Sequence, residues 1–362
     1  MKKLNEKEWR TFPAFSDDGL FHIATTSSSI DAVRLKDGDD KTVPYVTRSD
    51  MSNGVARFVS AENYDFGSDD GGCITVGLDT QTAFYQPHKF VTGQNVHVVT
   101  GEQLSEEVAF FLVTILREQM QAKFNWGGNG ATLGRMKRLL VMLPVNDNGK
   151  PDYGYMAQYA SEMRGGMLMR YRNYVAGQLS QLEYKDIPAL DEKVWHEYAL
   201  EELFSVGAGK RLTNADKIEG NRPFIGATDN SNGITGFVGN SNTSYDKNVL
   251  GVNYNGAPCI AFYHPYECIF SDDVKRLHLL HHEDNEYVLL FFKAIVMQQR
   301  TKYSYGYKFK EKRMLRQKLM IPVDDDGKPD YAYMAQYAKN MMLRKYRQYL
   351  AFLDVRVTED DE

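Results

Sequence analysis

The sequence contains no apolar run long enough to cross a membrane, and its first residues, MKKLNEKEWRTF, lack the apolar core of a signal peptide. The three cysteines, Cys73, Cys259 and Cys268, are odd in number and show neither a CxxC spacing nor a neighbouring set of histidine ligands. This argues against a disulfide framework and against a zinc site, so we expect free thiols in or near the core. We therefore expect a soluble, cytoplasmic protein.

Sequence signatures of catalysis are also scarce. Residues 207–210, Gly-Ala-Gly-Lys, lack the preceding glycine and the following Ser or Thr of a phosphate-binding loop, so a turn that exposes Lys210 and Arg211 explains them better. Adjacent side chains point in different directions, which makes residues 281–284, His-His-Glu-Asp, a solvated helix start rather than a metal site. Nucleophile-turn, amino-methyltransferase and nuclease motifs are absent. The sequence thus predicts no catalytic residue and no metal ligand.

The sequence has only a small net charge. The 362 residues carry a formal net charge of −5, and their 43% hydrophobic and 25% charged fractions are typical of globular protein, with enough chain for two domains of ordinary size. Most of the negative excess lies in the last nine residues, DVRVTEDDE. Local clusters of charge, rather than the total, therefore decide whether an anionic partner fits.

What the sequence does contain is a long internal repeat. Residues 143–163, LPVNDNGKPDYGYMAQYASEM, return 178 positions later as IPVDDDGKPDYAYMAQYAKNM. The stretches AFYQPHKF, from Ala83, and AFYHPYEC, from Ala261, are separated by the same distance. A block of this length does not recur by chance, so the chain is two copies of one unit.

Each copy predicts a mixed globule followed by a helix. Residues 43–59 read as a β-hairpin around an Asn53-Gly54 turn, and 222–238 as its counterpart. Residues 104–124 have helical periodicity behind Ser105, a plausible N-cap. A second helix should span 153–182, where Gly165-Gly166 is expected to kink it or end it early. The closing helix of the second copy should run through Leu353.

The predicted fold class is therefore α+β, with two tandem, internally duplicated mixed domains. The domain limits that we assign are 1–152 for the first domain, 153–190 for a connecting helix and linker, 191–330 for the second domain, and 331–362 for a closing helix with an acidic tail.

A basic segment interleaved with aromatic residues recurs at the same place in both copies. Residues 123–138 carry four cations and no acid, and residues 302–318 carry seven cations and one acid. Such segments suit phosphates and bases, although a solvated basic face remains the alternative. The candidate DNA contacts in these segments are Lys123, Asn125, Trp126, Asn129, Arg135, Lys137, Arg138, Lys302, Tyr303, Tyr305, Tyr307, Lys308, Lys310, Lys312, Arg313 and Arg316. The candidates in the hairpins are Arg48, Asn53, Arg57 and Asn232.

The closing helices repeat bulky residues at helical spacing. These residues are Tyr155, Met156, Tyr159 and Met163 in the first copy and Tyr333, Met334, Tyr337 and Met341 in the second. They either pack the copies together or hold a partner chain, and both roles are compatible because a helix has more than one face.

The order of several segments in each half resembles the specificity subunits of restriction-modification systems. These segments are Trp9 with VTRSDMSNGVARFV, Trp195 with HEYALEELFSVGAGKRLT and RPFIGATDNSNGITGFV, then AFYQP or AFYHP, then the LPV or IPV turn. The resemblance covers nearly the whole chain. It is similar to the type I subunits, and the short length and the GKPDY turn make it look still more like the type IIB kind.

This resemblance implies a non-catalytic reader of duplex DNA. Family members place two target-recognition domains in a pseudo-twofold arrangement, so that each reads one half of a split, asymmetric site. Their helices dock methyltransferase subunits, or subunits with fused restriction and methyltransferase activities. S-adenosylmethionine and Mg²⁺ are then expected on those partners and not on this chain. The helices here look shorter than those of many type I members.

Two other readings compete with this one. A tandem-repeat scaffold could bind acidic protein partners without reading bases, and selection from random duplex DNA would then enrich no split sequence. An enzyme with widely scattered catalytic residues is the third, and methyl transfer or cleavage by the purified chain alone would support it.

Overall fold

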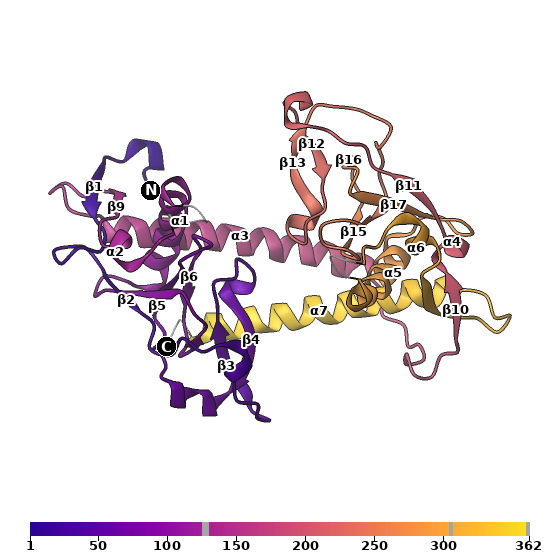
Figure 1. Cartoon of the computed structure of the whole chain (residues 1–362), viewed down its shortest axis with the longest axis horizontal. Helices are drawn as coiled ribbons and strands as arrows, with labels where there is room; N and C mark the ends of the chain where they lie inside the picture. Colours follow the sequence, from indigo (N-terminus) through magenta and orange to yellow (C-terminus); the bar gives the residue numbers. More distant parts are fainter. Residues whose placement is uncertain (125–129, 304–306, 360–362) are drawn as a thin grey trace. The chain divides into compact units, whose positions relative to one another are not determined.

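The computed structural model describes residues 1–124, 130–303 and 307–359, with side chains through residue 354. The chain divides into two compact units, Met1–Tyr171 (unit 1) and Arg172–Glu362 (unit 2) (Figure 1). The boundary falls inside the helix that we assigned to a connecting segment, and the domain limits given above stay a prediction.

Unit 1 is built from short strands and three helices. Its strands are β1 (Trp9–Pro13), β2 (His22–Thr25), β3 (Lys41–Val46), β4 (Val55–Ser60), β5 (Cys73–Gly77), β6 (Ala83–Gln86), β7 (Val91–Thr92), β8 (Val96–Thr100) and β9 (Leu140–Pro144). Its α-helices are α1 (Glu106–Lys123), α2 (Leu133–Met136) and the first part of α3 (Tyr153–Gln181). Its 3-10 turns are η1 (Leu4–Glu6), η2 (Ala32–Arg34), η3 (Ser52–Gly54) and η4 (Ala61–Phe66).

Unit 2 repeats this order after the end of α3. Its strands are β10 (Trp195–Ala199), β11 (Phe204–Ala208), β12 (Arg222–Ile225), β13 (Ile234–Val238), β14 (Val249–Asn253), β15 (Ala261–His264), β16 (Ile269–Phe270), β17 (Val274–Leu279) and β18 (Lys318–Pro322). Its helices are α4 (Leu200–Leu203), α5 (Glu286–Gln298), α6 (Glu311–Leu315) and α7 (Tyr331–Glu359), with 3-10 turns η5 (Asn214–Asp216), η6 (Ser231–Gly233) and η7 (Gln299–Lys302).

The sheets confirm that the chain is a duplication. Unit 1 has a four-stranded sheet in the order β2-β8-β5-β6, a three-stranded sheet β4-β3-β7 and the pair β1-β9. Unit 2 has β11-β17-β14-β15, β13-β12-β16 and β10-β18. In both three-stranded sheets one pair is antiparallel and the other is parallel. The observed class is the predicted α+β arrangement, twice.

Both hairpins form as predicted, and their turns explain the shared Ser-Asn-Gly sequence. Asn53 and Asn232 have φ angles of 57° and 53°, and Gly54 and Gly233 follow with 79° and 78°. This left-handed region excludes most side chains, whereas asparagine and glycine enter it readily. The turn residues therefore fix the register of β3 with β4 and of β12 with β13.

One amphipathic helix covers each four-stranded sheet. The predicted N-cap Ser105 accepts a hydrogen bond from the Val108 amide at the start of α1. Asn285 caps α5 in the same way, so residues 281–284 lie just before a helix as predicted. The buried face of α1 consists of Val108, Ala109, Phe111, Leu112, Leu116 and Met120, and that of α5 of Val288, Leu289, Phe291, Phe292, Ile295 and Val296.

The expectation that Gly165-Gly166 ends the first long helix is wrong. α3 runs through both glycines and has 29 residues, as does α7, which continues beyond Leu353 to Glu359. Each interior glycine costs about 1 kcal/mol, but α3 has fully buried residues on both sides of the pair, Met156 before it and Val175 after it. Tertiary packing therefore outweighs local helix propensity here.

Two smaller expectations have opposite outcomes. The three cysteines are free and buried, as predicted, and burial raises the pKa of each thiol to about 12. The prediction of a turn at residues 207–210 is wrong, because Gly207 and Ala208 belong to strand β11, where they pair with Arg276 and Lys275 of β17. Lys210 is exposed beyond the strand end, as expected.

Alanine replacements should distinguish a glycine that the backbone requires, Gly54 in a left-handed turn, from one that it does not, Gly165 inside a helix. Gly54→Ala is expected to destabilise the protein by about 1 kcal/mol, because φ is +79° and the new Cβ would lie 3.3 Å from the Thr47 carbonyl oxygen. Gly165→Ala, where a Cβ meets nothing within 4 Å, should stabilise it by about 0.5–1 kcal/mol. Urea denaturation midpoints measure both changes in stability. Midpoints that shift in the same direction for the two variants would contradict the different roles assigned to Gly54 and Gly165.

Candidate nucleic-acid interface

The connections of unit 1 converge at one end of its sheets, and we call this set the loop edge. It comprises residues 47–54, 78–82, 93–95 and 130–132, which follow or precede β3, β5, β8 and α2. The Leu78 amide donates to the Asn95 carbonyl at 3.0 Å, and the Ala131 amide donates to the Leu78 carbonyl at 3.0 Å. Arg48 forms an ion pair with Asp79 across two of these loops. The strand pairing therefore assembles polar side chains that are far apart in the sequence.

Unit 2 has an equivalent loop edge made of residues 226–233, 254–260 and 271–273. The Tyr254 amide donates to the Asp273 carbonyl at 3.1 Å, and the Asn255 side chain donates to the Asp273 carboxylate at 2.8 Å. The Asn253 amide group reaches the Thr228 carbonyl at 2.9 Å. The backbone arrangement is thus shared with unit 1, whereas the side chains differ. Two edges with one scaffold and unlike side chains suit two different targets.

Sequence reasoning missed the acidic and amide residues of these edges. Asp79, Gln81 and Asn95 in unit 1 and Asp273 with Asn255 in unit 2 were outside the basic segments that drew attention. The available signal was positional, because each lies in a polar turn between two short β-prone runs. Gln81 and Asn95 also have positive φ angles, of 53° and 62°, which marks them as turn residues.

The basic segment of unit 1 lies beside its loop edge. Lys123, Arg135 and Arg138 line one shallow cavity of about 270 Å³ together with Phe124 and Leu139. Arg135 donates to the Gly130 carbonyl at 3.0 Å, and Lys123 donates to the Leu140 carbonyl at 3.3 Å. Three cations that the sequence separates by up to 15 positions therefore meet in one place. Such a cavity suits a phosphate group.

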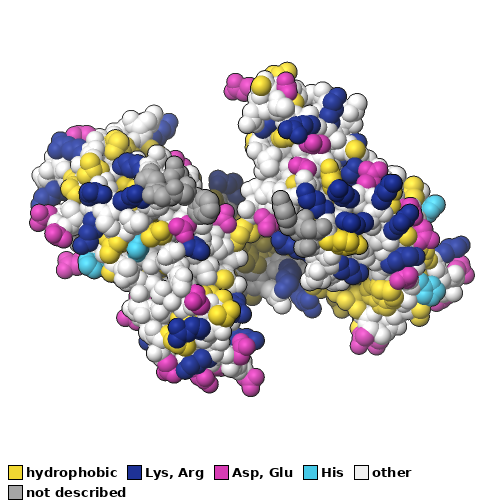
Figure 2. All heavy atoms as spheres, viewed as in Figure 1, with side chains coloured by type: hydrophobic (Ala, Val, Ile, Leu, Met, Phe, Trp, Pro, Cys, Tyr) yellow, Lys and Arg dark blue, Asp and Glu magenta, His cyan; other side chains and the backbone are white. Residues whose placement is uncertain are grey.

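Fully buried methionines hold both basic helices in place. Met136 in α2 and Met314 in α6 are 0% exposed. Arg135 and Arg313 precede them at the equivalent positions, and Arg138 and Arg316 follow them. In unit 2, Lys275 of β17 also forms an ion pair with Glu311 of α6 at 2.5 Å. Lys and Arg side chains are frequent on the face of unit 2 over α5, α6 and β17 in Figure 2.

Two aromatic residues in the basic segment of unit 2 have structural roles, and the predicted contact of Tyr303 with DNA stays a prediction. Phe309 is fully buried. The Tyr303 hydroxyl donates a hydrogen bond to the side-chain carbonyl of Gln317 at 2.6 Å. Burial raises the pKa of Tyr303 to about 12. Tyr307 differs, since it is 51% exposed and the Arg313 guanidinium lies 3.9 Å from its ring centre. Tyr307 is the most exposed of these three rings.

The remaining predicted contacts divide into surface residues and turn residues. Exposed side chains of the basic segments are Lys137, Arg138, Lys302, Lys310, Lys312, Arg313 and Arg316, and Lys308 is partly exposed. Asn125, Trp126, Asn129 and Tyr305 lie outside the described residues. Arg57 donates to the Ala32 carbonyl at 3.1 Å on the three-stranded sheet.

The turn asparagines have a structural explanation. Asn53 Nδ2 donates to the Tyr85 carbonyl at 2.8 Å, and Asn232 Nδ2 donates to the Tyr266 hydroxyl at 2.9 Å. The first contact ties the hairpin turn to strand β6 of the four-stranded sheet, and the second ties it to the segment that follows strand β15. These bonds explain both amide groups without a ligand. Both asparagines are exposed, and a contact of either with DNA stays a prediction.

A charged network stabilises the four-stranded sheet of unit 2. His278 lies between Asp284, 2.7 Å from Nδ1, and Asp246, 3.0 Å from Nε2, and Arg276 contacts Asp246 at 2.8 Å. Burial disfavours the charged imidazole, but hydrogen bonds and charges from the two aspartates outweigh burial and raise the pKa of His278 above its ordinary value. The imidazolium is thus favoured in the folded state.

This network predicts a pH-dependent stability. A raised folded-state pKa contributes stability that is fully present below the ordinary histidine pKa of about 6.5 and is lost as pH rises through the folded-state value. The denaturation midpoint of unit 2 should therefore fall over this range, and His278→Gln should remove that dependence. The exposed His22 of unit 1 provides the control substitution, His22→Gln. Identical pH profiles for the parent and His278→Gln would contradict the assignment.

Each unit also carries an apolar groove away from its loop edge. The groove of unit 1 has a volume of about 600 Å³ and lies between α1 and the start of α3. The groove of unit 2 has about 700 Å³ and lies between α5 and α7. Their equivalent lining residues are Leu4, Trp9, Phe111, Ile115, Tyr159, Ala160 and Met163 in unit 1 and Leu190, Trp195, Phe291, Ile295, Tyr337, Ala338 and Met341 in unit 2.

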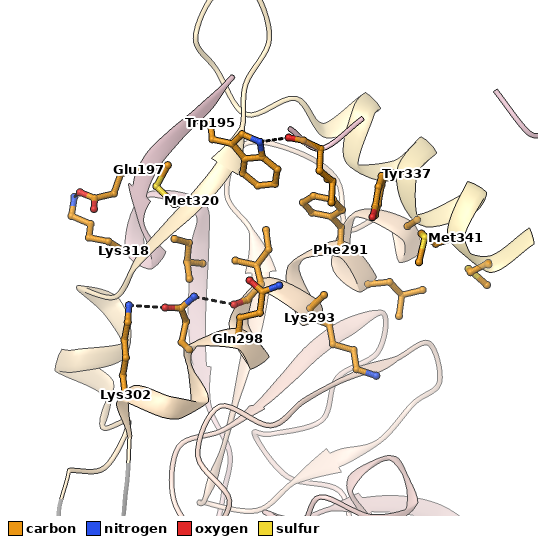
Figure 3. Close-up of a pocket in the computed structure, with 18 residues that line it drawn as sticks. Trp195, Glu197, Phe291, Lys293, Gln298, Lys302, Lys318, Met320, Tyr337 and Met341 are labelled. Carbon is orange, nitrogen blue, oxygen red and sulfur yellow. Dashed lines mark hydrogen bonds and ion pairs between the residues drawn. The ribbon is translucent and has the colours of Figure 1, made fainter. Parts of the chain in front are cut away.

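The aromatic geometry of the two grooves is nearly identical. Trp9 stacks on Phe111 at 6.3 Å and 20°, and Trp195 stacks on Phe291 at 6.4 Å and 21°. Figure 3 shows Trp195 and Phe291 side by side, Tyr337 and Met341 projecting from α7, and Lys302 and Lys318 at the rim. Tyr337 meets Phe291 edge to face. Duplication has preserved this surface more closely than the loop edges.

The predicted helix residues take two different positions. Tyr155, Met156, Tyr333 and Met334 are buried and pack each helix onto its own unit. Tyr159, Met163, Tyr337 and Met341 line the grooves instead, and Met163 is 48% exposed. In the described part of the chain, no cluster of His, Cys, Asp or Glu could hold a metal ion. Within the same residues, no helix is long and apolar enough to cross a membrane.

Comparison with known proteins gives a consistent set of relatives. The family model described as "Type I restriction modification DNA specificity domain" matches residues 10–164 and 192–349. The Type II restriction enzyme BgcI specificity subunit S.BcgI, from Heyndrickxia coagulans, is 37% identical over 330 residues, covering 91% of this chain and 94% of that protein.

Two solved structures are also similar. The S subunit of a type I restriction-modification system from M. genitalium is 18% identical, with a TM-score of 0.44 and coverage of 98% of this chain and 95% of that one. The HsdS subunit from Thermoanaerobacter tengcongensis is 12% identical, with a TM-score of 0.33 and coverage of 87% and 85%.

Proposed function

The chain belongs to the family of type I restriction-modification DNA specificity domains, and from this premise we propose that it is a non-catalytic specificity subunit that reads a split duplex DNA sequence. Each unit reads one half of the site. S-adenosylmethionine and Mg²⁺ belong to partner subunits, and the complex works in the cytoplasm. The short, divergent loops at equivalent places in both units support this proposal most directly.

The described contacts suit a division of labour within each unit. Lysines and arginines of the basic segments neutralise phosphates and fix the register of the duplex, which carries no sequence information by itself. Side chains of the loop edge then meet base edges in the major groove. Joining two readers in one chain converts weak binding of each half into tight binding of the whole site, provided that both halves engage together.

Selection from a random duplex library tests this function. The chain, assembled with its partner subunits, is incubated with DNA that contains a long randomised region, and the bound fraction is sequenced after several rounds. We expect a sequence with two defined halves and an undefined spacer. A protein-interaction scaffold would enrich no such sequence, and that result would overturn the proposal.

We further propose that the two apolar grooves hold the methyltransferase-bearing partners. The grooves share their stacked Trp-Phe pairs and their Tyr and Met positions, so each suits the same apolar segment of an identical partner. Exposed aromatic and methionine side chains in a concave surface are typical of protein interfaces. One chain would then recruit two copies of one partner, one beside each half-site.

A further inference from the structure

Unit 1 has a base-reading candidate that its basic segment does not include. Arg48 lies two residues beyond β3, and its guanidinium contacts the carboxylate of Asp79, two residues beyond β5. Asn95, just before β8, donates from Nδ2 to the same carboxylate at 3.3 Å. Three separate turns therefore place one arginine at the loop edge.

The geometry leaves much of this guanidinium available. Among the contacts of the described residues, Nη1 alone is in hydrogen-bond or ion-pair contact with Asp79, which leaves Nη2 and Nε as donors. The Arg48 side chain is 46% exposed and that of Asp79 is 27% exposed. A carboxylate on one side of a planar guanidinium limits its rotation and turns its remaining N–H groups outward.

Asp79 is itself fixed by the backbone around it. Gln81 Nε2 donates to the Asp79 carbonyl at 2.8 Å, and the Leu78 amide donates to the Asn95 carbonyl at 3.0 Å. Asn95 adopts a left-handed conformation with φ 62°, which brings its side chain back toward the 78–82 turn. Arg48 is thus held by a carboxylate in a turn that is itself fixed by hydrogen bonds.

Unit 2 has no arginine at the position equivalent to Arg48, although Asp229 of its loop edge forms a long ion pair with Arg300, at 3.9 Å. The hairpins align through their shared Pro and Ser-Asn-Gly residues, and the residue of unit 2 that corresponds to Arg48 is Ala227. Asp273, one of the aspartates at the loop edge of unit 2, accepts from Asn255 at 2.8 Å. The arginine of unit 1 thus comes from the hairpin and that of unit 2 from the 3-10 turn η7, and a difference of this kind between two duplicated domains suits a role in telling their targets apart.

We propose that Arg48 reads a guanine in the half-site bound by unit 1 and that Asp79 is the positioning residue that orients it. Guanine offers O6 and N7 as paired acceptors in the major groove, and an arginine that donates to both discriminates against other bases. The proposal rests on the proposed function and names one specificity-determining residue within it. Arg48 touches the base, whereas Asp79 acts through Arg48.

The test measures affinity at every position of the selected site. Each base pair is substituted in turn, and Kd values are obtained for the complexes that contain the parent chain, Arg48→Ala, Arg48→Lys and Asp79→Asn. For the parent we expect one G·C pair in the unit 1 half at which substitution weakens binding about 5- to 150-fold. Arg48→Ala should abolish discrimination at that pair alone, because alanine has no donor. Arg48→Lys should reduce it, because the lysine ammonium lacks the planar fork that Asp79 orients. Asp79→Asn should reduce it at the same pair.

The half-site of unit 2 serves as the internal control for folding, since its base preferences should stay unchanged in every variant. Equal weakening by Arg48→Ala for all sequences would show a phosphate contact and overturn the proposal. A uniform gain in affinity for Asp79→Asn would show that Asp79 merely repels DNA, and would overturn its positioning role. If the parent selects no split sequence, the proposed function itself fails, which is a different result.

Discussion

Replacing Arg135, Lys137 and Arg138 with glutamate is expected to weaken binding to the selected DNA about 100-fold at moderate salt. Arg135 and Arg138 line one cavity with Lys123, and Lys137 is exposed beside them. Three lost contacts of about 1 kcal/mol each amount to roughly this factor in Kd. The slope of log Kd against log salt should also fall by roughly 2.7, or about 0.9 for each phosphate contact.

A single reversal at Lys150 provides one control for charge. Lys150 is exposed in the turn after β9, whereas Arg138 lies before the start of that strand. Lys150→Glu should leave both the affinity and the salt slope nearly unchanged. Unchanged affinity of the triple variant in a low-salt titration would show that the basic segment of unit 1 is a solvated face and not the DNA surface.

Glutamate at the equivalent groove positions Met163 and Met341 should remove the partner subunits one at a time. Burying an unpaired carboxylate in an apolar interface costs several kcal/mol, which corresponds to at least about a 100-fold loss of affinity. Met163→Glu and Met341→Glu should each yield a complex that lacks one partner copy, and the double variant should bind none. Native mass spectrometry or light scattering of the reconstituted complex measures the stoichiometry.

Met169 offers the matched control for this experiment. It also lies on α3 and is 65% exposed, but it does not line the groove. Met169→Glu should therefore leave the stoichiometry unchanged. If the single groove variants retain the full number of partners, or if Met169→Glu loses one as readily, then the grooves are not the docking sites.

The elements set by local sequence were predictable. The hairpin turns follow from Asn-Gly and α1 from its N-cap and periodicity, because turn chemistry and amphipathicity act over a few residues. The long repeat then predicted the second half from the first. The course of α3 through Gly165-Gly166 was not predictable, since it depends on tertiary packing, such as the complete burial of Val175 beyond the two glycines.

The candidate site was predictable only in part. The basic segments are visible as runs of Lys and Arg, and the structure places two of their arginines in one cavity. The pair Arg48 and Asp79 is not visible, because its members are 31 positions apart and the pairing of β3 with β7 and of β5 with β8 brings them together. The burial of Phe309 is not visible in the sequence either, since an aromatic residue in a basic run looks the same whether it meets a base or fills the core.

The most direct test of the whole account compares the DNA sequences selected by two variants of the complex. One variant carries glutamate at Arg135, Lys137 and Arg138 of unit 1, and the other carries glutamate at the exposed Lys312, Arg313 and Arg316 of unit 2. We predict that each variant loses sequence definition in one half of the selected site, that the two affected halves differ, and that the other half persists each time. Loss of definition across both halves in either variant would contradict the claim that each unit reads its own half.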